Sequence, residues 1–123
     1  MAVKANIGTY IPFKPEADSV FAEHIHPMVP QTYRVKPDQG VLPKGLVVAF
    51  DDNNLIVPFN PSATDSTGTP VGVLPNRVDT TKETNAVVGV HGVVYRDRIV
   101  VKNGNVDETV LKKLAEIGIW NIG

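Results

Sequence analysis

Three histidines are the side chains best suited to chemistry in this chain, and their spacing decides what they could do. His24 and His26 are separated by one residue, so in an extended segment both would point to the same side and could offer two imidazoles to a metal. A zinc site needs further ligands, and the neighbouring Glu23 would face the other way. We therefore expect no metal site. His91 has no serine, cysteine or paired carboxylate spaced to form a catalytic set with it, so we expect a partly buried structural histidine.

Other polar motifs in the chain also fall short of a reactive site. Asp51 to Asn54 offers carboxylates, but it lacks the glycine and the distal glutamate of a calcium loop, so we interpret it as a tight turn. Gly89 and Gly92 are not followed by the helix and lysine of a phosphate-binding loop. The absence of cysteine removes thiol nucleophiles, thiolate metal ligands and disulfides. We predict a protein that is not an enzyme and has no cofactor, metal or small-molecule substrate.

Charge and hydropathy exclude two further classes of partner. Lys and Arg number 12 against 13 Asp and Glu, a net charge of -1, which gives no attraction to a nucleic-acid backbone or an anionic membrane. The longest apolar runs, such as 46–50, reach about five residues and are too short to span a bilayer. Residues 1–6 lack the apolar stretch of a signal peptide, so we expect a protein made in the cytoplasm.

The elements that must position these residues are short strands. Ten prolines and ten glycines are spread along the 123 residues, and they favour many turns. We predict a mainly β fold with one C-terminal helix. Residues 46–50 and 55–59 form a predicted hairpin, and Pro58 places its second strand at a sheet edge because proline has no N–H to donate. Further strands are predicted at 32–36, 70–75 and 86–95, and the two glycines in the last predict a bulge.

One segment has the pattern of a helix, residues 106–117. Asn105 is the predicted N-cap, with Glu108 three residues later in a capping box, and Gly118 is the predicted left-handed residue after the helix. The apolar residues that follow should pack back on the core. Within them, Trp120 is interpreted as a core or oligomer-interface anchor.

The first thirty residues differ from the rest. Four prolines block a regular helix, and the apolar side chains there show no sustained period. We therefore divide the chain into an extended N-terminal arm, residues 1–30, and a β-rich domain, residues 31–123. The arm carries aromatic and aliphatic side chains that a solvated tail would not need, so it should order against something else. The alternative is that it wraps its own domain.

The order of four segments resembles the lambdoid phage head decoration (capsid-stabilising) proteins. Gly8 to Pro12 is similar to an aromatic-proline element in the family's N-terminal arm. The second and third are the strand that follows Gly40 to Gly45 and the apolar strand 70–74. The ending at 114–119, where the capped helix runs into glycine and isoleucine, is similar to the family's close.

The resemblance implies a β-clip or β-tulip-like domain and a homotrimer on the outer surface of the virion. The trimer would bind the major capsid protein at local threefold sites and stabilise the expanded head, without catalysis. Strand addition by the arm would supply the contact, so the expected capsid-binding residues are Thr9, Tyr10, Ile11, Pro12 and Phe13.

Two other classes stay open at this point. One is another virion subunit, of the head–tail joint or the tail tube, which would form rings of a different symmetry. The other is a nucleotide-hydrolysing enzyme on a β-clip scaffold, which would need acidic and serine-bearing motifs that the sequence does not contain.

Overall fold

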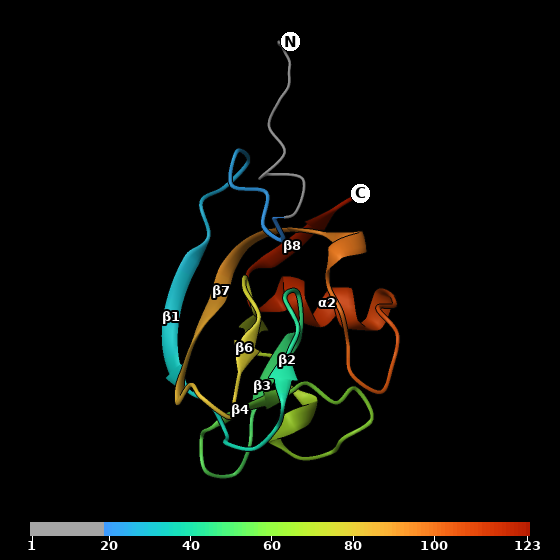
Figure 1. The fold of residues 1–123 in the computed structure, drawn as a ribbon. Helices are drawn as coiled ribbons and strands as arrows, with labels where there is room; N and C mark the ends of the chain where they lie inside the picture. The colour runs from blue at the N-terminus through green and yellow to red at the C-terminus, as the bar shows by residue number, and fades with distance from the viewer. Residues whose placement is uncertain (1–18) are drawn as a thin grey trace.

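The computed structural model describes residues 19–123 (Figure 1). Within them the chain forms eight β-strands, two short 3-10 helices and one α-helix near the C-terminus, which confirms a mainly β fold with one C-terminal helix. The elements are β1 (Val29–Arg34), β2 (Val41–Leu42), β3 (Val47–Phe50), β4 (Ile56–Pro58), η1 (Ser66–Gly68), β5 (Gly72–Val73), β6 (Val78–Asp79), β7 (Asn85–Tyr95), η2 (Arg96–Arg98), α2 (Glu108–Glu116) and β8 (Ile119–Ile122).

The long strand β7 organises the larger sheet. That sheet has the order β1-β7-β5-β3-β4, and β8 pairs with the far end of β7. The pairing of β7 with β1 and β5 is antiparallel, whereas β8 runs parallel to it. The two edges of the sheet approach each other, because Val35, just after β1, bridges to Ile56 in β4. A separate two-stranded sheet pairs β2 with β6.

The predicted hairpin is confirmed, with β3 and β4 antiparallel and Phe50 opposite Ile56. The turn between them depends on Asp51, whose Oδ1 accepts hydrogen bonds from Asn53 N at 2.8 Å and Leu55 N at 3.0 Å. Asn54 takes a left-handed backbone with φ of 62°. The acidic tetrapeptide is therefore the tight turn that the sequence predicts. Pro58 lies on β4, the last strand in the sheet order, as expected for a proline at an edge.

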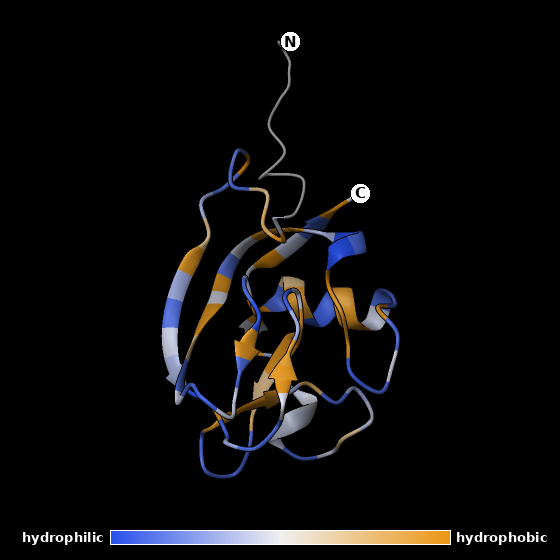
Figure 2. Cartoon of the chain, viewed as in Figure 1, coloured by the Kyte–Doolittle hydropathy of each residue, from blue (hydrophilic) through white to orange (hydrophobic). Residues whose placement is uncertain are grey.

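Buried apolar side chains from both faces of the strands form two cores. Figure 2 shows the apolar residues along the strands and the helix. Val47 and Ala49 of β3 face one core, which also takes Phe59 and the buried face of α2. Val48 between them faces the other core, with Ile56. Because a slip of one residue would exchange the two faces of β3, this double burial fixes the register of the hairpin.

The helix is shorter than predicted at both ends, and the expected cap is wrong. It spans Glu108–Glu116, and its N-cap is Asp107, whose carboxylate accepts from Val110 N at 3.0 Å. Asn105 stands outside the helix. Glu108 forms an ion pair with Arg96 instead of a capping box. Gly118 has φ of 93° and donates to Ala115 O at 3.0 Å, so the predicted left-handed end is confirmed.

The packed part of the chain begins before the boundary expected at residue 31. Val20, Phe21 and Ala22 are buried, and β1 starts at Val29. Residues 20–22 are therefore packed into the core, and Phe21 forms a bridge with Val94 of β7. Among residues 19–123, no helix is long and apolar enough to cross a membrane.

Candidate interaction surface

The five residues expected to bind a capsid, Thr9 to Phe13, lie outside the described residues. The segment Ser19 to Ala22 packs against the end of β7 and is called the root. The root and β8 both attach to the end of β7, so they share one end of the molecule (Figure 1).

Hydrogen bonds hold the root against β7 and the segment after it. Tyr95 N donates to Val20 O at 2.9 Å, and Ala22 N donates to Val93 O at 2.7 Å. The guanidinium of Arg98 donates to the Ser19 carbonyl at 2.7 Å. A segment paired on both sides of Phe21 is part of the sheet. Backbone pairing thus fixes the root on the domain.

Two glycines of β7 make room for the buried ring of Phe21. A Cβ on Gly89 would overlap the tip of that ring, and a Cβ on Gly92 would lie 3.2 Å from it. The ladder between β1 and β7 shifts register at this place, since Val29 pairs with His91 but Pro30 pairs with Gly89. The bulge predicted from the two glycines is confirmed, and its role is to accept Phe21.

The histidines separate into different environments. His24 is exposed in the turn after the root, whereas His26 is half-buried, and its Nδ1–H donates to Pro27 O at 2.7 Å. The His26 ring meets the His91 ring edge-on, with centroids 5.0 Å apart, and His91 meets Trp120 at 5.2 Å. His24 and His26 therefore do not form the side-by-side pair that an extended segment would give. Residues 19–123 contain no group of three or more side chains suited to a metal.

These rings form an exposed patch beside the root. The aromatic patch is defined as Val29, His26, His91 and Trp120. Trp120 is 45% exposed and Val29 41%, so both side chains are partly open to solvent. Trp120 is thus not a core residue, and the sequence alone left both roles open for it. The sequence alone does not predict this patch, because its residues come from three regions far apart along the chain: the segment 26–29, β7 and β8.

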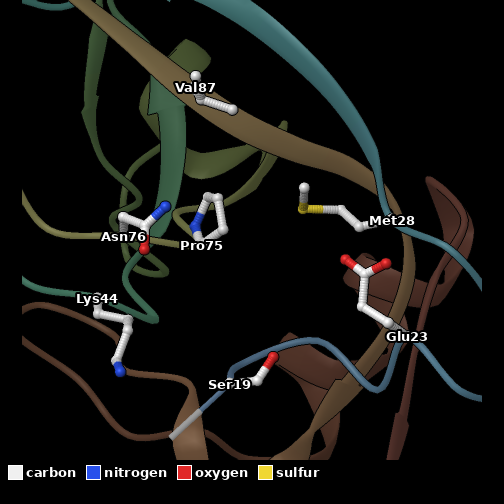
Figure 3. A pocket seen from close by; sticks show the side chains of 7 residues that line it. All are labelled: Ser19, Glu23, Met28, Lys44, Pro75, Asn76 and Val87. Carbon is white, nitrogen blue, oxygen red and sulfur yellow. The ribbon is translucent and has the colours of Figure 1, made fainter. Parts of the chain in front are cut away.

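A cleft of about 410 Å³ lies on another side of the root (Figure 3). Apolar side chains of Met28, Pro75 and Val87 line it, and Figure 3 shows Glu23 and Lys44 on opposite sides of the opening. The Ser19 hydroxyl donates to Phe21 O at 2.8 Å, so it is engaged in holding the root. This combination offers shape and a few polar groups but no nucleophile paired with a base.

The described residues thus form a small β domain with a root held by the sheet and a partly exposed aromatic patch beside it. The sequence matches the family model described as bacteriophage lambda head decoration protein D over residues 12–119, which is most of the chain. The chain therefore belongs to the head decoration protein family, whose members are structural proteins of the phage capsid. The match includes Pro12 and Phe13 of the expected capsid-binding residues. A comparison with curated proteins found no match.

Proposed function

We propose that the chain assembles as a homotrimer on the outer surface of a phage head, binds the major capsid protein, and stabilises the expanded shell. The observation that carries this proposal is the match to the head decoration family over residues 12–119. The fixed root supports it, because a segment that reaches a neighbouring protein transmits force only if its base is held by the domain. Hydrogen bonds on either side of Phe21 provide that base.

The N-terminal segment makes the proposed contact with the shell. An extended chain advances at most about 3.3–3.6 Å per residue, so Phe13 lies within roughly 20 Å of Ser19 and Thr9 within roughly 35 Å. Strand addition to an exposed capsid edge would let the backbone of Thr9 to Phe13 supply hydrogen bonds, while Tyr10 and Phe13 fill apolar pockets. Ordering this segment costs about 1–2 kcal/mol per residue, which the contact has to exceed.

Three segments acting together overcome that cost. Once one segment of a trimer is bound, the other two bind intramolecularly, so modest contacts combine into strong attachment. A trimer of 13.3-kDa chains has a mass of about 40 kDa, which light scattering measures directly. A ring of higher symmetry would instead favour the head–tail joint or the tail tube.

Removal of residues 1–15 tests the role of the segment. The truncated protein should keep the trimer mass and the thermal unfolding of the full chain, because the described fold begins at residue 19. It should lose binding to expanded, undecorated heads built from the cognate capsid protein, measured by co-sedimentation. A finer pair of variants compares a Tyr10→Ser, Phe13→Ser double substitution with Lys4→Ser, which lies outside the expected contact. Full occupancy by the truncated protein would contradict the proposed arm.

A further inference from the structure

We propose that the aromatic patch is a second, rigid contact with the same capsid subunit that receives the N-terminal segment. This inference rests on the proposed function and adds to it a surface of the folded domain. It concerns Val29, His26, His91 and Trp120, none of which is among the expected capsid-binding residues 9–13, although His26 and Val29 fall within the arm expected at residues 1–30.

The patch is fixed in shape before any partner arrives. The His91 ring lies between the rings of His26 and Trp120, at 5.0 and 5.2 Å, and it packs over Gly118, where a Cβ would come within 2.5 Å of its Nδ1. The hydrogen bond from His26 to Pro27 O holds the outer ring. These side chains would therefore lose little conformational entropy when a partner binds.

The composition of the patch is typical of a binding surface. Trp120 and Val29 expose nearly half of their side-chain surface, and Ile25, in the adjoining turn, is 53% exposed. An exposed tryptophan that packs against a neighbouring ring, as Trp120 does against His91, is the kind of residue that carries a large share of binding energy. The patch itself holds no carboxylate, ammonium or guanidinium group. It therefore suits a mainly apolar surface of a shell protein.

The position of the patch favours a capsid subunit as the protein that binds it. Val93 of β7 accepts a hydrogen bond from Ala22 of the root, and it pairs with Trp120 of β8 on its other side. The root, to which the N-terminal segment is joined, thus lies one strand away from Trp120. A capsid subunit that captures this segment lies over the same end of the domain. A second copy of the chain seated there would stand between the root and the shell.

Binding of patch variants to expanded, undecorated heads tests the inference. Trp120→Ala should weaken the affinity for heads by about 10–100-fold, in line with the loss of a central interface tryptophan. Val29→Ser should weaken it about 3–10-fold. The matched control is Val41→Ser, which changes a valine that is 50% exposed on β2, and it should bind like the wild type. Each variant is first checked for trimer mass and thermal unfolding, and Val29→Ser serves if Trp120→Ala does not fold.

Two results would overturn the inference. Patch variants that bind heads within twofold of Val41→Ser would show that the patch does not touch the shell. A patch variant that folds but loses the trimer mass would show that the patch lies between copies of the chain. Both results are distinct from failure of the proposed function, in which the wild type itself does not bind the heads.

Discussion

At the scale of single residues, Gly45 lies just before β3, between the end of β5 and the segment that follows η2. Its N–H donates to Leu74 O and its carbonyl accepts from Val100 N, both at 2.8 Å, and its φ is 90°. A Cβ at this position would collide with the carbonyl of Arg98. Gly45, two residues before β3, thus has to be glycine for both conformational and steric reasons.

Substitution of this glycine tests that reasoning. Gly45→Ala should lower the free energy of unfolding by about 2–4 kcal/mol, since it adds a backbone collision to left-handed strain. Gly40→Ala is the matched control, because Gly40 has φ of 72° but an added Cβ would meet nothing within 4 Å. It should cost only about 1 kcal/mol. Chemical denaturation measures both, and equal losses would contradict the collision.

Asp79 is a second residue whose surroundings matter, because they lower the pKa of its carboxyl group. Hydrogen bonds from the Thr81 hydroxyl, at 2.6 Å, and from Thr81 N, at 3.1 Å, lower the pKa of the Asp79 carboxyl below its ordinary value of 3.8. A carboxyl with a depressed folded-state pKa stabilises the fold above about pH 4. That stabilisation is lost as the pH falls through the folded-state pKa.

Removal of the hydroxyl donor should therefore raise this pKa. In Thr81→Val, the carboxyl pKa of Asp79 should move up toward 3.8, because the largest stabilising hydrogen bond to the carboxylate is gone. Carbon-detected NMR titration of the side-chain carboxyl measures the change. Thr84→Val changes a neighbouring threonine that makes no hydrogen bond to this carboxylate through its side chain, and it should leave the titration as it is. An unchanged pKa in Thr81→Val would exclude the hydroxyl as the cause.

At the scale of elements, the start of α2 shows which of two possible N-cap residues, Asn105 or Asp107, caps the helix. Asp107 caps the helix through Val110 N, whereas the predicted Asn105 lies two residues earlier. Asp107→Ala should lower the free energy of unfolding by about 1 kcal/mol, and Asn105→Ala should change it by less than about 0.5 kcal/mol. Thermal unfolding of the two variants, measured side by side, decides between them. A larger loss in Asn105→Ala than in Asp107→Ala would instead support the longer helix that the sequence predicts, capped by Asn105.

Elements made of neighbouring residues could be predicted, and those made by distant ones could not. The β3–β4 hairpin follows from two apolar runs joined by Asp51 to Asn54, and the end of α2 follows from Gly118, because both signals are local. The root is different. Phe21 is buried only because Gly89 and Gly92, far along the chain, leave space for its ring. The parallel pairing of β8 with β7 likewise joins residues far apart along the chain, so no local sequence pattern predicts it.

At the scale of the whole molecule, the candidate site combines a predicted part and an unforeseen one. Thr9 to Phe13 remain a prediction of the sequence. The aromatic patch required the fold, because the turn after the root, β7 and β8 each contribute one ring. The aromatic patch lies beside the root, which backbone pairing holds against the end of β7. We therefore expect attachment to a shell through one end of the domain.

The thermal disruption of expanded heads tests this account most directly. Undecorated heads are heated in calorimetry alone and with saturating protein, and the bound protein is quantified after sedimentation. Binding only to the intact shell should raise the disruption temperature in step with occupancy, since a ligand at 100 times its Kd stabilises each site by about 2.7 kcal/mol. Heads that gain no protein, or that gain protein and break down at the same temperature as bare heads, would contradict the account.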